Sequence, residues 1–444
     1  MYVPAPGPRR VEVTHRRMLL IALPMTVSHM TTPLLGLVDA TVIGRLGEAH
    51  LLGAVALGAV IFDFLFWSFG SLRMATAGLT AQAVGAGDAR EIDRTLARAL
   101  AVAAMVGLGL VLLQWPIAQA AFALAGASEA VTGALAEYFA IRIWAAPFTL
   151  ANYVILGSTL GRARTDLGLV LQVAINLANI VLTTVLVIGF ELGIGGAAIG
   201  TVLAEIAGTV LGFAVLRRLG SNPFAVSRGE IFDRAAMLRT LAVNRDIMIR
   251  TAALVLAFAI FSAQGARAGD VTLAANAVLY NMFLVGGYFL DGFATAAETL
   301  CGQAFGARDE RAFRRAISLS LIWSLGFGLA VSLIFLIGGG QFIDFVSTNP
   351  EVRSHARDYL VFAALTPLVG ATAFAFDGIY VGATWTRPMR DLMLAAFAAY
   401  ALVLLTSQDL GNAGLWVAFL VFLGVRGLGQ AALFPRLTRE SFQT

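Results

Sequence analysis

The residue best suited to do chemistry is Asp39, an acidic side chain inside a long apolar run near the start of the chain. Burying a carboxylate in hydrocarbon costs roughly 3 kcal/mol or more unless it is satisfied, so such residues are usually functional. Burial favours the protonated form, so Asp39 could take up and release a proton. It could equally bind Na⁺ together with carbonyl oxygens, the ligands that hard cations prefer. The structural alternative is a carboxylate held by hydrogen bonds near a helix end or paired with Arg45.

A second polar group follows helical spacing in the apolar run 167–189. Asn176, Asn179 and Thr183 are spaced three and four residues apart, so all three lie on one face of a helix. Such a stripe either lines a hydrated cavity or joins helices by hydrogen bonds. We expect it to line a cavity, with Asp39 and Thr201 nearby.

The second half of the chain carries its own carboxylates in apolar runs. Asp377 is a candidate ion or substrate site, with a helix-packing carboxylate as the equal alternative. Asp291 and Glu298 are seven residues apart and therefore share a helical face two turns apart. We interpret them as a charged cavity wall, with contacts that brace the helices as the close alternative.

Two arginines within apolar runs, Arg73 and Arg426, also need partners. Asp63, or a carboxylate of the run 271–303, could supply them. We favour structural ion pairs for both arginines, because an unpaired charge in hydrocarbon is costly.

The elements that carry these residues are predicted to be membrane-spanning helices. Hydrophobic residues make up 59% of the chain and charged residues 13%, whereas about 25% of a soluble domain is charged. Apolar runs of eighteen or more residues recur, each long enough to cross about 30 Å of hydrocarbon. The sequence shows no nucleophile–base pair, metal-ligand spacing or phosphate loop. We therefore expect no enzyme and no cofactor, apart from a coupling H⁺, or Na⁺ at Asp39 or Asp377.

A shift of 221 residues lays the chain on top of itself. Residues 81–90 align with 302–311, and Gly157 then aligns with Gly378. Two apolar halves of six helices each are typical of a transporter built from parallel repeats. We predict an all-α polytopic membrane protein with twelve transmembrane helices in two pseudo-twofold-related bundles. Its expected parts are a tail 1–17, an N-lobe 18–217, a connection 218–239, a C-lobe 240–434 and a tail 435–444.

The arginines sort to one side of this predicted bundle. The loops on one face carry most of them, including the whole connection 218–239, whereas the other face keeps Arg45, Arg267, Arg353 and Arg357. Positively charged loops stay in the cytoplasm, so both termini are expected there. The basic residues are therefore a topology signal, and we expect no nucleic-acid partner.

Several stretches of the chain resemble the multidrug and toxic compound extrusion (MATE) family, in its DNA-damage-inducible protein F branch. The most specific are 36–47, 73–82 and 377–390. The paired loops 82–88 and 303–309, each with a Gln-Ala-x-Gly-Ala-x-Asp pattern, add to the resemblance. It covers nearly the whole chain.

The resemblance implies a V-shaped, two-lobed exporter in the bacterial inner membrane that exchanges amphipathic, often cationic, organic compounds for H⁺ or Na⁺. It implies that Asp39 is central to coupling and that Asn179 belongs to the same polar network. Many bacterial relatives have an aspartate where this chain has Thr183, which favours protons over Na⁺. Some relatives bind their cation in the second lobe, where Asp377 is the matching carboxylate. A monomer in the lipid bilayer is the default expectation.

Two other transporter classes remain as alternatives. A lipid-linked precursor flippase of the same superfamily usually has extra helices and a strongly basic cavity. A major-facilitator transporter shares the helix number and repeat orientation, but residues 85–90 only partly match its usual signature. A purely structural membrane protein would not need buried carboxylates in both halves.

Overall fold

The computed structural model describes residues 11–443, and at 32–37, 39 and 40 it describes the backbone alone. Over this part the chain forms helices joined by short loops, without a strand. The α-helices are α1 (His15–Gly44), α2 (Ala49–Trp67), α3 (Ser71–Ala86), α4 (Ala89–Leu112), α5 (Gln114–Ala125), α6 (Glu129–Arg142), α7 (Ala146–Gly161), α8 (Thr165–Thr184), α9 (Gly193–Arg218), α10 (Arg228–Ile231), α11 (Arg234–Arg267), α12 (Asp270–Gly306), α13 (Glu310–Val346), α14 (Pro350–Gly382), α15 (Thr386–Thr406) and α16 (Gly411–Phe442). Short 3-10 or π segments are η1 (Ile143–Ala145), η2 (Val185–Gly189), η3 (Pro223–Ala225) and η4 (Gln408–Leu410).

Eleven helical segments among the described residues are long and apolar enough to cross a membrane. With α1, a helix of 30 residues, they give the twelve spans predicted from the sequence. Some spans contain more than one helix: the predicted run 52–83 consists of α2 and α3, which are separated by a turn at 68–70. The protein is therefore an all-α polytopic membrane protein.

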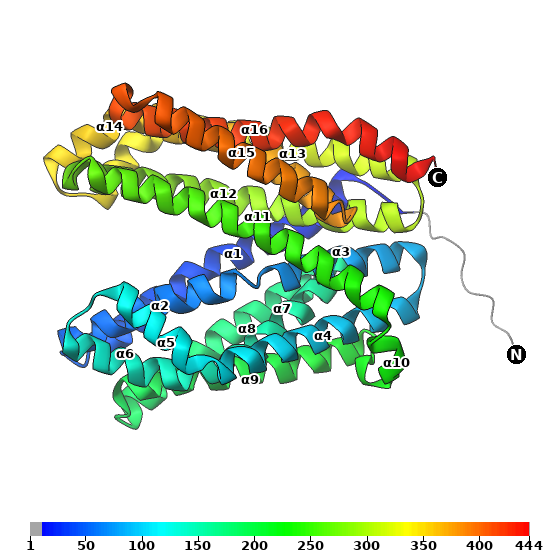
Figure 1. The fold of residues 1–444 in the computed structure, drawn as a ribbon, viewed down its shortest axis with the longest axis horizontal. Helices are drawn as coiled ribbons and strands as arrows, with labels where there is room; N and C mark the ends of the chain where they lie inside the picture. Colours follow the sequence, from blue (N-terminus) through cyan, green and yellow to red (C-terminus); the bar gives the residue numbers. More distant parts are fainter. Residues whose placement is uncertain (1–10, 444) are drawn as a thin grey trace, which may run out of the picture. The chain divides into compact units, whose positions relative to one another are not determined.

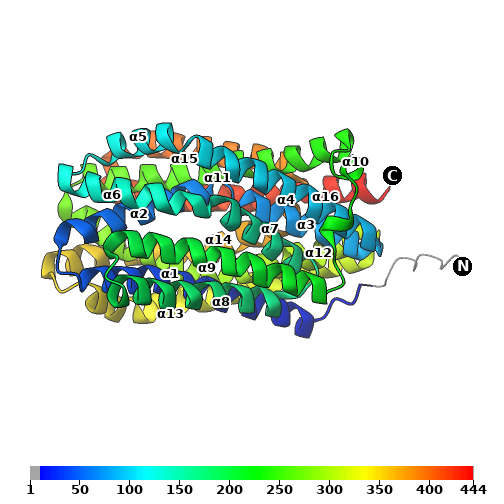
Figure 2. The same cartoon turned by 90° about the horizontal axis from the view of Figure 1, so that it is seen from below.

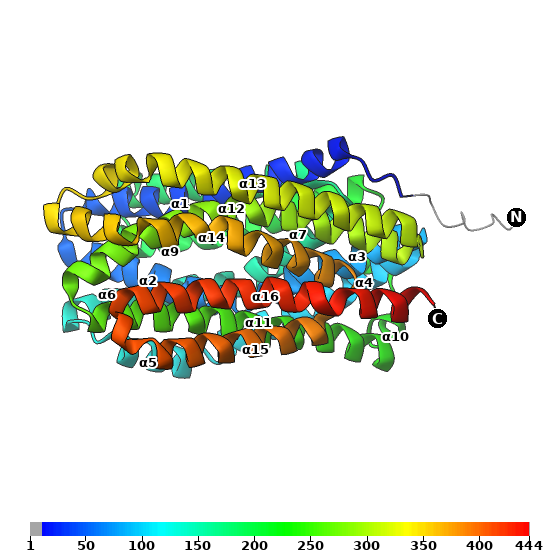
Figure 3. The ribbon, with the colours of Figure 1, turned by 90° about the horizontal axis from the view of Figure 1, so that it is seen from above.

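The helices form two compact units. The N-terminal unit comprises Val27–Ala83 and Asp88–Asn244, and the C-terminal unit comprises the chain from Arg245 onward, Val84–Gly87 and the residues up to Thr26. Helices α12 to α16 run alongside one another in the C-terminal unit (Figures 1 and 3), where α14 contacts α12, α13 and α16. In the N-terminal unit α4 packs on α7, and α8 packs on α9 (Figure 2).

Close helix packing at equivalent glycines supports the internal repeat. A Cβ atom added to Gly157 in α7 would come within 2.4 Å of the Arg73 carbonyl oxygen in α3. A Cβ atom added to Gly378 in α14 would come within 2.0 Å of the Ala294 carbonyl oxygen in α12. Both members of each pair are separated from their counterparts by the same 221 residues. The two halves therefore bring equivalent helices into backbone contact at equivalent positions.

The repeated loops after α3 and α12 start the next helix in the same way. Oδ1 of Asp88 accepts a hydrogen bond from the Glu91 amide at 2.9 Å, and Oδ1 of Asp309 accepts one from the Ala312 amide at 2.9 Å. Aspartate at this position satisfies an amide that has no partner within its own helix. Both loops are thus helix caps, as their sequences predict.

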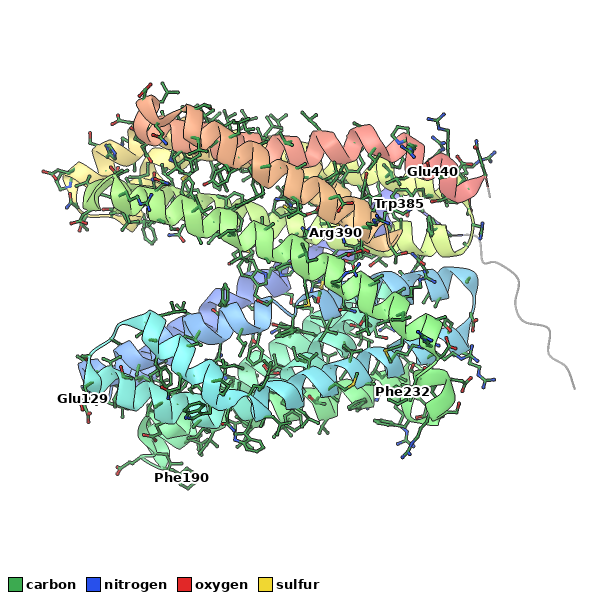
Figure 4. The ribbon with its side chains drawn as sticks, viewed as in Figure 1. Glu129, Phe190, Phe232, Trp385, Arg390 and Glu440 are labelled. Atoms are coloured by element: carbon green, nitrogen blue, oxygen red, sulfur yellow. The ribbon has the colours of Figure 1, made fainter. Side chains whose placement is uncertain are left out.

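Labelled residues mark the ends of each unit. In the N-terminal unit, Phe232 lies at the opposite end from Glu129 (Figure 4). In the C-terminal unit, Trp385, Arg390 and Glu440 lie toward one end (Figure 4). At that end Nη1 of Arg390 pairs with Oδ1 of the buried Asp246 at 2.7 Å, which joins α15 to α11.

Candidate ion-coupling site

The polar stripe of α8 is buried and links three helices of the N-terminal unit. Nδ2 of Asn176 donates a hydrogen bond to Oγ1 of Thr31 in α1 at 3.1 Å. Nδ2 of Asn179 donates one to Oγ1 of Thr201 in α9 at 3.0 Å. The exposed fractions of Asn176, Asn179 and Thr183 are 8%, 2% and 0%. Four residues predicted from the sequence therefore meet around α8.

Two oxygen atoms of this stripe lack a hydrogen-bond partner among the described residues. They are Oδ1 of Asn179 and Oγ1 of Thr183, both buried. Thr183 is held close to α9, since a Cβ atom added to Gly200 would lie 2.8 Å from its Oγ1. A buried acceptor without a donor costs about 1–3 kcal/mol. The arrangement is suited to an added proton donor or cation.

Asp39 lies in the same helix as Thr31, eight residues further along α1. Its side chain lies outside the described residues, and so do those of Pro33 and Gly36. The backbone at 39 is helical, so the proline at 33 does not end the helix. The predicted role of the Asp39 carboxyl group therefore stays a prediction.

Asp377 of the C-terminal unit lies in a buried ionic cluster. Nη2 of Arg250 in α11 donates to its Oδ2, and Nη2 of Arg426 in α16 donates to the same oxygen at 2.7 Å. Nε2 of Gln430, one turn after Arg426, donates to Oδ1 at 2.9 Å. The exposed fractions of all four residues are 7% or less. The carboxylate therefore joins α11, α14 and α16.

The charge of this cluster is set by its composition. When all three charged groups are ionised, two guanidinium groups outnumber one carboxylate and leave one positive charge in excess. The guanidinium of Arg426 also lies 5.4 Å from the centre of the Phe422 ring, at a distance typical of cation–π contacts. A mobile cation at Asp377 would have to compete with two fixed ones.

The partner that the sequence suggested for Arg426 is wrong. Neither Asp63 nor a carboxylate of 271–303 pairs with it; its partner is Asp377, 49 residues earlier in the chain. The role of Arg250 was missed, although an arginine in the middle of an apolar run could have signalled it. Glu298 is buried in α12 and Asp291 is half-buried, and neither donates to or accepts from the Asp377 cluster in the described structure.

A third polar cluster, in the N-terminal unit, was also missed. Nδ2 of Asn152 in α7 donates to Oε2 of Glu205 in α9 at 2.6 Å. Arg142, at the end of α6, interacts electrostatically with both Glu205 and Asp63. These residues come from separate helices, so their spacing in the sequence carries no signal of their contact.

Comparisons with known proteins agree with this architecture. The MatE family profile matches residues 24–185 and again 247–406, once in each half. The chain is 40% identical to DNA damage-inducible protein F of Escherichia coli (strain K12), over 95% of this chain and 92% of the relative. It is 28% identical to a probable multidrug resistance protein NorM of Bradyrhizobium diazoefficiens, over 90% of this chain and 89% of that protein.

A similar solved structure is the outward-facing conformation of a multidrug resistance MATE family transporter of the MOP superfamily. Its TM-score is 0.83 at 18% identity, with 99% of this chain and 98% of that chain covered, so it supports the fold. The double family match, the 40% identity and the twelve-helix architecture lead to one assignment. The chain is a member of the multidrug and toxic compound extrusion family, and is a membrane transporter and not an enzyme.

Proposed function

We propose that this protein is a secondary active efflux antiporter that exports amphipathic organic cations in exchange for H⁺, by alternating access. The observation that carries the proposal is the pair of buried acceptors, Oδ1 of Asn179 and Oγ1 of Thr183, which lack donors among the described residues. A protonated Asp39 would supply a hydrogen-bond donor to such acceptors. Release of that proton would remove the donor, so the contacts between α1 and α8 would depend on protonation.

The helix register supports this role for Asp39. As the first and fifth spans, α1 and α8 cross the membrane in the same direction. From the contact between Thr31 and Asn176, eight residues forward on α1 and seven on α8 lead to the levels of Asp39 and Thr183. Each residue advances a helix by about 1.5 Å, so the two positions are at similar depth.

We favour H⁺ over Na⁺ as the coupling ion for two reasons. A neutral threonine at 183 gives the α8 stripe no carboxylate of its own, whereas cation sites are usually built from anionic oxygen ligands. In the C-terminal unit, the Asp377 carboxylate already accepts from two guanidinium groups. Both features weaken the attraction for a metal cation.

The proposed setting is the bacterial inner membrane, with a monomer as the working unit and both termini in the cytoplasm. The arginine-rich connection 218–239 supports this orientation, because positively charged loops stay on the cytoplasmic side. The export of organic compounds is suggested by the name of the NorM relative, a probable multidrug resistance protein.

Purified protein in sodium-free liposomes tests the proposal. A pH gradient alone, imposed without Na⁺, should drive ethidium transport, and collapse of the gradient with a protonophore should stop it. A Na⁺ gradient at equal pH should drive little transport. Transport that follows Na⁺ and ignores the pH gradient would contradict H⁺ coupling, and transport driven by neither gradient would contradict antiport.

A further inference from the structure

One exposed face of α2 carries a carboxylate between aromatic rings. Val60, Phe64 and Trp67 have exposed fractions of 66%, 63% and 47%, and Asp63 between them is also exposed. Asp63 and Trp67 are four residues apart, so they are neighbours on the helix surface. These four residues are called the α2 patch below. The opposite face, which includes Phe62 and Phe66, is buried in the N-terminal unit.

The depth of the patch indicates that it faces water. Asp63 lies fourteen residues into the apolar span that starts at Ala49, which corresponds to about 21 Å of helix. At this depth a carboxylate on a lipid-facing surface would be costly, and intramembrane acidic residues face the protein interior or a hydrated cavity. The exposed face of α2 therefore borders a hydrated space, and Phe64 and Trp67 share it.

The Asp63 carboxylate is available for a ligand. It makes no hydrogen bond or ion pair with any residue that the structure describes. Arg142 is the cation that acts on it, but its guanidinium lies 4.8 Å from the centre of the fully buried Phe62 ring. Arg142 also donates to the Tyr138 hydroxyl and interacts with Glu205. Its charge is therefore shared within the unit, and Asp63 carries the charge of the exposed face.

We propose that the α2 patch is a substrate subsite for a planar aromatic cation. Asp63 would pair with the positive charge, while the rings of Phe64 and Trp67 would contact the flat face of the ligand. An aromatic ring attracts a cation through its negative face, so the carboxylate and the rings select for the same ligand class. This inference rests on the proposed efflux of organic cations and assigns part of their recognition to α2.

Equilibrium binding to the purified full-length protein in nanodiscs tests the subsite. The probes are ethidium, a planar cation, and dihydroethidium, its uncharged reduced form, handled without oxygen. Asp63→Asn should raise the Kd for ethidium about three- to tenfold, as expected for loss of one partly hydrated ion pair. The Kd for dihydroethidium should stay the same, and Asp63→Glu should retain ethidium binding. Trp67→Leu should weaken both probes.

The control is Asp166→Asn, which removes an exposed carboxylate at the start of α8 that pairs with Arg164. It should leave both Kd values unchanged. Equal ethidium affinity in wild type and Asp63→Asn, or equal loss for both probes, would overturn the proposal. If Asp63→Asn does not fold, Asp63→Ser decides by the same criteria. Because binding is measured without an ion gradient, failure of the antiport mechanism alone would leave this result unaffected.

Discussion

Nη2 of Arg17 donates a hydrogen bond to Oε1 of Gln303 at 2.8 Å, which joins the start of α1 to the end of α12. The equivalent contact in the N-terminal unit joins Nη2 of Arg239 to Oε1 of Gln82 at 3.3 Å. Gln82 and Gln303 are equivalent in the repeat, and each arginine lies near the start of the first long helix of its half. The first helix of each half therefore begins in the unit formed mainly by the other half.

This contact predicts an energetic coupling between Arg17 and Gln303. Arg17→Met and Gln303→Met should each lower thermal stability, and the double variant should lose less than the sum. The coupling should be about 0.5–1.5 kcal/mol, the usual net contribution of one hydrogen bond. Thermal unfolding in detergent measures it, with the exposed Arg16→Met as control. Additive losses would show that the contact contributes nothing.

Gly378→Ala should strongly destabilise the C-terminal unit. The new Cβ atom would lie 2.0 Å from the Ala294 carbonyl oxygen, so α14 and α12 would have to separate. Overpacking of this kind typically costs about 1–3 kcal/mol. Gly133→Ala is the matched control, because a Cβ atom there meets nothing within 4 Å. An unchanged melting temperature for Gly378→Ala would contradict this packing.

The Asp377 cluster predicts an order of stabilities. Asp377→Asn leaves two buried guanidinium groups without a counterion, and removal of one partner of a buried pair typically costs about 3–5 kcal/mol. Arg250→Gln leaves one guanidinium and one carboxylate, so it should cost less. Thermal unfolding of both variants gives the order. If Arg250→Gln were the less stable variant, the cluster would not be limited by excess positive charge.

Glu230 in the connection predicts a local dependence on pH. Its Oε1 accepts from Nη2 of Arg94 at 2.6 Å, and its Oε2 accepts from Oγ of Ser227 at 2.9 Å. The hydrogen bond from Arg94, followed by those from Ser227, lowers the pKa of Glu230 to about 2 from the ordinary 4.5. The stabilisation from Glu230 is therefore fully present above pH 4.5 and is lost as the pH falls through about 2.

Hydrogen exchange of the connection measures this effect. Glu230→Gln should weaken protection of α10 at pH 7, and the difference from wild type should shrink progressively below pH 4.5. A difference that persists unchanged at the lowest pH would show that the ionised carboxylate is not the cause.

Much of the fold could be predicted from local patterns. Span length and hydrophobicity predicted the helices, and the repeat predicted that Asp88 and Asp309 begin equivalent helices. Partners between distant helices could not be predicted. The contact of Arg426 with Asp377 depends on how α14 and α16 pack, and periodicity within one helix carries no information about its neighbour.

The candidate site follows the same division. The spacing of Asn176, Asn179 and Thr183 predicted their common face, because it depends on one helix alone. The bonds to Thr31 and Thr201 required the packing of α1 and α9 against α8. Asp63 was considered only as an ion-pair partner, since its exposure could not be read from an apolar run.

The central claim is that protonation of Asp39 drives export, and ethidium efflux by the Asp39→Asn variant tests it most directly. Efflux is measured in everted vesicles energised by a pH gradient, at membrane expression equal to wild type, with Asp166→Asn as control. The account predicts that Asp39→Asn abolishes efflux while the control retains it. Undiminished ethidium extrusion by Asp39→Asn would contradict it.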